Sequence, residues 1–192
     1  MKKALHETVI YGGAFNPPTR AHQAILQACI DYAEPRGADV WLLPSASRHD
    51  KTIHVPRERR IALLEALVKD VMIRTVKVSI AMLELDRSGP TETYETVQAL
   101  GAEHPERTFT WVFGHDSLAS MPTWRGGEWL LGNLSILVAG HSDDDVPYEP
   151  PNIGRLPFDA GEIRSTEVRR RIEVGEDYSE LVGEHVGRVL QI

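Results

Sequence analysis

The residues best suited to chemistry form a compact cluster near the N-terminus, Gly12-Gly-Ala-Phe-Asn-Pro-Pro-Thr-Arg-Ala-His22. Glycines let backbone amides approach a ligand closely, and the free amides at a helix start favour negative charge. Thr19 and His22 are one helical turn apart and would lie on one face of the following helix. The pattern predicts a phosphate-binding loop in which both side chains donate hydrogen bonds to one polyphosphate. A tight turn followed by a surface histidine is simpler, but it does not explain why these polar residues and prolines occur together.

A second cluster lies near the C-terminus, in Ile163-Arg-Ser-Thr-Glu-Val-Arg169. Ser165 and Thr166 are expected to cap a helix and to direct hydroxyls and amides at phosphate. Arg169 follows one turn later and adds a planar cation that suits phosphate. On its own, this segment is equally compatible with an ordinary capped helix that has a solvated arginine face. Neither Gly-x-Gly-x-x-Gly nor a Walker-type Gly-Lys-Ser/Thr occurs, which argues against a dinucleotide oxidoreductase or a P-loop kinase.

Alternating strand-like and helix-like segments must position these two clusters. Apolar runs predict strands at 8–11, 40–43, 76–80, 108–113 and 134–139, and helical periodicity predicts helices at 19–32, 57–69, 91–102, 165–173 and 182–190. In the helix at 57–69, Arg60 is expected on the solvated face. The segment 140–159, with Asp143-Asp-Asp145 and four prolines, is expected to be a flexible loop. The alternation predicts an α/β fold with a parallel sheet that is covered on both faces and binds ligands at its carboxyl edge.

Length and composition limit the class of protein. The 192 residues, 42% of them hydrophobic, suit one domain, 1–192, with a short helical subregion from about residue 163. A net charge of −7 argues against a broad electrostatic grip on nucleic acid or anionic lipid. Cys29 is the only cysteine, which fits a reducing cytoplasm, and no apolar stretch is long enough to span a membrane.

Two further segments, Phe113-Gly-His-Asp-Ser-Leu118 and Met121-Pro-Thr-Trp124, join the two clusters already described. Together the clusters resemble the nicotinate-nucleotide adenylyltransferases, a family of the nucleotidyltransferase superfamily related to class I aminoacyl-tRNA synthetases. The family's motifs are Gly-Gly/Ser-x-Phe-Asp/Asn-Pro-x-His/Thr-x-Gly-His, Gly-x-Asp-Ser-Leu, Pro-x-Trp and Ile-Ser-Ser-Thr-x-x-Arg. The resemblance covers about residues 8 to 171, in the family's order and spacing.

The resemblance implies a fold, a reaction and a set of site residues. It implies a Rossmann-like, doubly wound nucleotidyltransferase fold and transfer of AMP from ATP, with Mg²⁺ carried by the ATP, to nicotinate mononucleotide. The products are nicotinate adenine dinucleotide and pyrophosphate. The expected catalytic residues are His22, Thr19 and Arg169. The other expected ATP-binding residues are Gly12, Gly13, Ala14, Phe15, Gly114, Asp116, Ile163, Ser165 and Thr166, and the expected acceptor-binding residues are Asn16, Lys51, Thr93 and Trp124.

Several positions depart from the family pattern and leave alternatives open. Thr19 stands where many members have histidine, and Ala21 and Arg164 replace a glycine and a serine. Glu92 replaces an aromatic residue, and if it faces the pyridine it would disfavour a carboxylate and favour an amide. Nicotinamide mononucleotide or phosphopantetheine therefore remain alternative acceptors, and a catalytically inactive nucleotide-binding module is a third hypothesis. Core packing is the less favoured alternative for Trp124, Lys51 could equally be solvated, and the sequence leaves homo-oligomer formation open.

Overall fold

A parallel sheet organises the protein, seen here in a computed structural model that describes residues 5–46, 55–87, 89, 91–140, 152–158 and 163–191. Within these residues, six strands pair in the order β3-β2-β1-β4-β5-β6, and every pairing is parallel. The strand order reverses between β1 and β4. The carboxyl ends of these two neighbours therefore flank the crevice in which open parallel sheets bind ligands.

The elements follow the alternation expected from the sequence. The strands are β1 (His6–Gly13), β2 (Asp39–Pro44), β3 (Val78–Ile80), β4 (Arg107–Gly114), β5 (Ser135–Gly140) and β6 (Ile153–Pro157). The α-helices are α1 (Arg20–Ala33), α2 (Arg57–Lys69), α3 (Thr93–Glu103), α4 (His115–Ser120), α5 (Gly127–Asn133), α6 (Ser165–Val174) and α7 (Glu184–Leu190). Short 3₁₀ turns lie at η1 (Glu34–Arg36), η2 (Met121–Thr123) and η3 (Ser179–Leu181). The predicted α/β class with a parallel sheet is confirmed.

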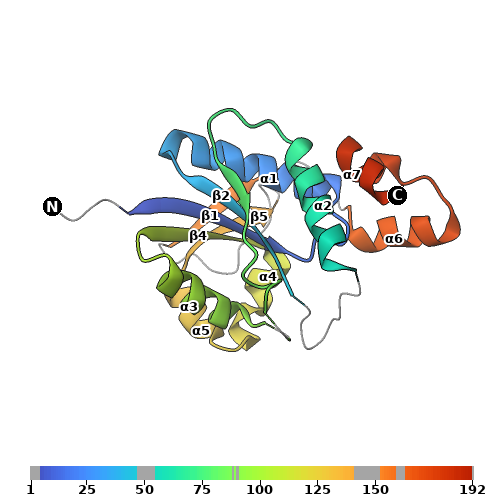
Figure 1. The fold of residues 1–192 in the computed structure, drawn as a ribbon. Helices are drawn as coiled ribbons and strands as arrows, with labels where there is room; N and C mark the ends of the chain where they lie inside the picture. The colour runs from blue at the N-terminus through green and yellow to red at the C-terminus, as the bar shows by residue number, and fades with distance from the viewer. Residues whose placement is uncertain are drawn as a thin grey trace.

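Two apolar clusters lie on opposite faces of the sheet. Figure 1 shows α1 and α2 on one side of the strands and α3, α4 and α5 on the other. Leu26 of α1 and Leu64 of α2 are fully buried in the first cluster, and Leu100 of α3 and Leu130 of α5 are buried in the second. Because both faces are covered, the central strands carry nearly continuous apolar runs, which made them predictable.

One strand contradicts the expected loop at 140–159. The segment Ile153–Pro157 forms β6 and extends the sheet by pairing with Ile136–Gly140 of β5. Its Gly154 and Arg155 break the apolar run that marks the other strands, so local composition concealed it. The backbone donors and acceptors at the open edge of β5 supply the reason for pairing. The remainder of the expected loop, 141–151 and 159, lies outside the described residues.

The C-terminal helices are joined to the sheet layers through a buried carboxylate. Asp70, at the end of α2, accepts hydrogen bonds from the backbone amides of His185 (2.9 Å) and Val186 (3.2 Å) in α7. The Nδ1 atom of His185 lies 2.8 Å from the same carboxylate. A Cβ at Gly183 would lie 2.1 Å from Asp70 Oδ2, so the approach requires glycine there. None of the described helices is both long and apolar enough to cross a lipid bilayer.

Candidate active site

A cavity of about 260 Å³ opens at the carboxyl ends of β1, β2 and β4, where the strand order reverses. Parallel sheets place their ligands at this position because the following loops and helix starts converge there. Five of the predicted site residues line it: Gly12, Gly13, Ala14, Thr93 and Trp124. These five residues come from three separate segments of the chain and meet around one space. The cavity is the centre of the candidate site.

Gly13 was expected to let backbone amides approach a ligand, but it also makes room for the ring of Phe15. The Phe15 ring is 1% exposed and packs edge-on against Tyr11, with ring centroids 5.2 Å apart. A Cβ at Gly13 would lie 3.2 Å from that ring, so the glycine accommodates Phe15 rather than a ligand alone. Phe15 does not line the cavity, and its contact with ATP stays a prediction. Phe15 instead supports the loop from beneath, and its ring centroid lies 5.4 Å from that of His22.

Thr19 and His22 are joined to each other at the start of α1. The backbone N–H of Thr19 donates to His22 Nδ1 (3.1 Å), and the Thr19 hydroxyl lies 2.8 Å from the same nitrogen. Because Nδ1 accepts the backbone N–H, the proton of the neutral ring is assigned to Nε2, which can donate to a ligand. Burial lowers the pKa of His22 to about 4, so the imidazole is neutral near pH 7. Thr19 itself is 1% exposed and its hydroxyl lies against His22, while its contact with ATP stays a prediction.

The C-terminal motif docks on the N-terminal one. Arg169 donates to the carbonyl of Asn16 (2.6 Å), and the Ser165 hydroxyl donates to the carbonyl of Pro17 (2.8 Å). The Thr19 hydroxyl is also 3.4 Å from the carbonyl of Ile163. Residues that are about 150 positions apart in the sequence thus form one surface, and Arg169 is bound to the loop that leads into α1.

Part of the predicted capping is wrong. The N-cap of α6 is Arg164, Ser165 is the first helical residue, and its hydroxyl bonds Pro17 instead of the helix. The first amides of α6, at Ser165 and Thr166, have no partner within the helix by geometry alone. Nη2 of Arg169 lies 3.5 Å from the hydroxyl oxygen of the exposed Thr166. The helix start therefore still offers donors, but through its backbone.

Two buried charged residues behind the cavity were not anticipated. Arg60, expected in solvent, is 5% exposed and donates to the carbonyls of Ala14 (3.2 Å) and Ser45 (2.5 Å). It thus ties together the loops that follow β1 and β2. Burial lowers the pKa of Arg60, while the negative charge of Glu84 acts in the opposite direction. Helical periodicity cannot distinguish such an arginine from a solvated one, because both occur on polar positions of the helix.

Glu84 is the second buried charged residue, and it lines the cavity itself. It is 7% exposed and accepts hydrogen bonds from the Ala46 amide (3.2 Å) and the Thr91 hydroxyl (2.9 Å). Its other oxygen accepts from Thr96 (2.8 Å), in the first turn of α3. Three donors thus satisfy both oxygens of this buried carboxylate. It fixes the loop after β2 relative to α3, and no local motif in the sequence marks it.

The remaining predicted residues differ in their position relative to the cavity. Trp124 is half-buried at the cavity, edge-on to Phe113 with centroids 6.0 Å apart, so part of the indole is free for a ligand. Gly114 and the exposed Asp116 are at the start of α4, directly after β4, and do not line the cavity. Lys51 lies outside the described residues. Glu92 is half-buried at the N-cap of α3, next to Thr93.

With this geometry established, comparison with known proteins identifies the family. The cytidylyltransferase-like family model matches residues 10–171, which include both clusters and the whole cavity lining. The chain belongs to the cytidylyltransferase-like family. The resemblance to nicotinate-nucleotide adenylyltransferases seen in the motifs agrees with this assignment.

Relatives of this cytidylyltransferase-like chain carry a consistent name. A protein of Anaeromyxobacter dehalogenans is 31% identical over 186 residues, covering 96% of this chain and 94% of the relative. One of Halalkalibacterium halodurans is 27% identical over 186 residues, covering 94% and 86%. Both are named probable nicotinate-nucleotide adenylyltransferase. The chain is a nucleotidyltransferase related to these proteins.

Solved structures share the fold. The Plasmodium falciparum nicotinic acid mononucleotide adenylyltransferase, complexed with NaAD, superposes with a TM-score of 0.76 at 18% identity, covering 97% of this chain and 95% of that one. A putative nicotinate-nucleotide adenylyltransferase of Vibrio parahaemolyticus gives a TM-score of 0.70 at 20% identity, covering 97% and 93%. The Rossmann-like nucleotidyltransferase fold is thereby confirmed. Among the described residues, no three His, Cys, Asp or Glu side chains gather as metal ligands would.

The environment of His22 predicts a pH-dependent stability. Between pH 6.5, the ordinary pKa of histidine, and pH 4, the unfolded chain binds a proton at His22 that the folded chain does not. Stability contributed by the neutral ring is therefore lost as the pH falls through this range. In His22→Gln this loss is absent, and the urea midpoint should fall less between pH 7 and pH 4.5 than in the wild type. The other histidines are common to both proteins, so equal falls would contradict the partly buried, neutral imidazole.

Proposed function

We propose that the protein transfers AMP from ATP to nicotinate mononucleotide, forming nicotinate adenine dinucleotide (NaAD) and pyrophosphate. The observation that carries this proposal is the junction of the two motifs, in which Arg169 bonds the carbonyl of Asn16 on the loop that leads to His22. The junction supplies an imidazole donor, a guanidinium and the first amides of α6, at the loop that continues from the cavity-lining residues 12–14. Donors of these kinds are suited to a polyphosphate.

The chemistry requires alignment and charge stabilisation more than proton transfer. A 5′-phosphate oxygen of the acceptor forms a bond to the α-phosphorus of ATP, and the bond from that phosphorus to the bridging oxygen breaks. The electron pair leaves on pyrophosphate. Because the attacking phosphate is already anionic, no general base and no covalent intermediate with the protein are needed. Mg²⁺ arrives with ATP as part of the substrate and neutralises part of the phosphate charge.

Each residue of the junction has a distinct part in this reaction. His22 donates from Nε2 to the triphosphate, held in that orientation by the backbone N–H of Thr19. Arg169 retains donors beyond the one used on Asn16 and stabilises the charge that develops on the leaving group. The amides of Ser165 and Thr166 add partial positive charge at the start of α6. Thr19 is a positioning residue in this reaction.

Trp124 and Thr93 favour a pyridine nucleotide as the acceptor. Both line the cavity, and the partly free indole of Trp124 can stack on an electron-poor ring. The names of the bacterial relatives and the NaAD bound in the Plasmodium structure support the same assignment. Nicotinamide mononucleotide is the second candidate, because the carboxylate of Glu92 adjoins Thr93 in the sequence and would repel an acidic ring substituent.

A comparison of acceptors tests the proposal. Pyrophosphate release is measured with ATP, magnesium and, in turn, nicotinate mononucleotide, nicotinamide mononucleotide and phosphopantetheine. We expect kcat/KM to be highest with nicotinate mononucleotide. A higher value with either other acceptor would contradict the acceptor assignment, and the absence of pyrophosphate with all three would favour a binding module without catalysis.

Two adjacent arginines of α6 provide a matched pair of variants. Arg169→Ala removes the contact with Asn16 and the positive charge at the loop, so we expect kcat/KM for ATP to fall about 10²-fold. Arg170→Ala serves as the control, because Arg170 is exposed and pairs with Glu167 and Glu176. Its rate should stay within about twofold of the wild type, as expected for a surface ion pair. Steady-state kinetics that show equal losses in both variants would remove Arg169 from the mechanism.

A further inference from the structure

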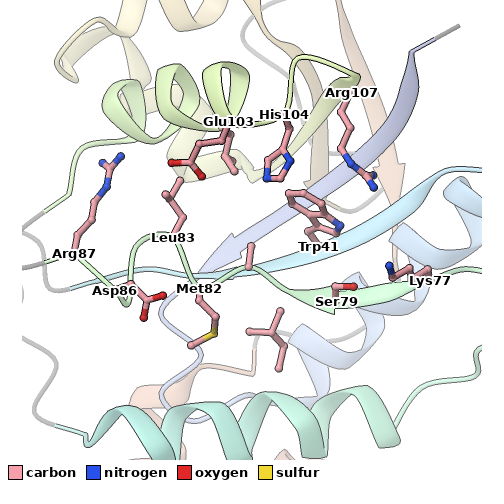
Figure 2. Close-up of a pocket in the computed structure, with 13 residues that line it drawn as sticks. Trp41, Lys77, Ser79, Met82, Leu83, Asp86, Arg87, Glu103, His104 and Arg107 are labelled. Carbon is pink, nitrogen blue, oxygen red and sulfur yellow. The ribbon is translucent and has the colours of Figure 1, made fainter. Parts of the chain in front are cut away.

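A second cavity, of about 570 Å³, lies beside β2 and β3 on the face of the sheet that α3 covers in part (Figure 2). It shares no lining residue with the candidate active site. Its floor includes Trp41 and Leu83, and the end of α3 contributes Leu100 and His104. It is more than twice as large as the cavity at the strand ends, and the proposed reaction does not use it.

The register of the edge strand groups three of its residues. Trp41 of β2 is directly opposite Ser79 of β3 in the parallel pairing. Lys77 precedes Ser79 by two positions, and its carbonyl accepts the Val40 N–H (2.9 Å) directly before β3, so both side chains are expected on the same face. Figure 2 shows Lys77 and Ser79 on the same side of the cavity as Trp41. An aromatic surface, a hydroxyl and an ammonium group thus lie along one side of a single space.

Trp41 is held rigidly in this position. The His104 ring meets it edge-on with centroids 5.0 Å apart, and the Arg107 guanidinium lies 4.9 Å from the indole centroid. Arg107 is fixed in turn by Asp39, at 2.8 Å, and by the Thr8 hydroxyl, at 2.7 Å. The positive charge of Arg107 is therefore already compensated by a carboxylate, and it orients the indole. Lys77, next to Ser79, and Arg87, farther along the lining, are the cations that can serve a ligand.

Lys77 and Ser79 lack partners of their own within the described part of the chain. No hydrogen bond or ion pair there engages the exposed Lys77 ammonium or the half-buried Ser79 hydroxyl. A lysine without an acidic partner therefore lies beside a partly exposed indole, in a protein whose net charge is −7. A planar ring could pack against Trp41 and Leu83 while its anionic group meets Lys77 and Ser79. This pairing satisfies the polar groups without opening the existing Arg107–Asp39 contact.

We propose that this cavity is a second ligand site that binds a small planar aromatic anion, with its ring against Trp41 and its carboxylate, sulfonate or phosphate group at Lys77 and Ser79. The site is independent of the proposed adenylyl transfer, because neither its residues nor its expected ligand contacts involve the loop at Gly12–His22. Glu103 and Asp86, the latter paired with Arg57, line the cavity together with Arg87, so they offset part of its positive charge and disfavour a ligand with several negative charges. A single anionic group is therefore the chemistry that fits.

The probe for this site is 8-anilinonaphthalene-1-sulfonate, an aromatic anion whose fluorescence rises in apolar surroundings. Its affinity is measured by fluorescence titration on the full chain, and its stoichiometry by calorimetry. Lys77→Glu reverses the charge at the site, and the matched control Lys69→Glu makes the same change at an exposed position on α2, on the opposite face of the sheet. Trp124→Ala tests whether the probe occupies the active-site cavity instead.

We expect one probe molecule per chain and a Kd that rises at least tenfold in Lys77→Glu. Lys69→Glu and Trp124→Ala should change this Kd less than twofold. The uncharged analogue N-phenyl-1-naphthylamine should show no difference between the wild type and Lys77→Glu. Equal effects of the two lysine variants, loss of binding in Trp124→Ala, or the absence of saturable binding would each overturn the proposal. All these readouts are independent of pyrophosphate release.

Discussion

The candidate site depends on hydrogen bonds between side chains of one motif and backbone carbonyls of the other. Arg169 and Ser165 donate to the carbonyls of Asn16 and Pro17, and Thr19 approaches the carbonyl of Ile163 in the reverse direction. Carbonyls in a proline-containing loop have no strand partner, and leaving them unpaired when buried would be costly. The start of α6 supplies the missing donors. The same contacts that satisfy the loop also bring Arg169 to the segment that carries His22.

The start of α1 combines a structural and a chemical requirement. His22 accepts the backbone N–H of its own N-cap residue, which would otherwise lack a partner. This contact determines which ring nitrogen carries the proton, and burial keeps the ring neutral. The imidazole is therefore presented as a neutral donor, and the positive charge at the junction comes from Arg169. A threonine at position 19 suits this arrangement because its hydroxyl reaches both His22 and Ile163.

Periodicity and local motifs were enough to predict the regular elements, whereas features that depend on tertiary contacts were not visible in the sequence. Continuous apolar runs identified the central strands, and the helix predicted at 57–69 coincides with α2. β6 was not predicted because its pairing depends on the edge of β5 rather than on its own composition. The buried positions of Arg60 and Glu84 were not predicted because their partners lie on other elements and no spacing rule links them. The proximity of Arg169 to the Asn16 loop was expected only from the family resemblance, since spacing alone cannot join segments so far apart.

The segment between β3 and α3 lines both cavities. Glu84 lines the active-site cavity, while Leu83 and Asp86 line the second cavity.

The most direct test of the joined phosphate site is a crystal structure of the protein with bound ATP. We predict that His22 Nε2 and the Arg169 guanidinium each lie about 3 Å from phosphate oxygens of the same ATP molecule. A triphosphate bound away from either side chain would contradict this arrangement.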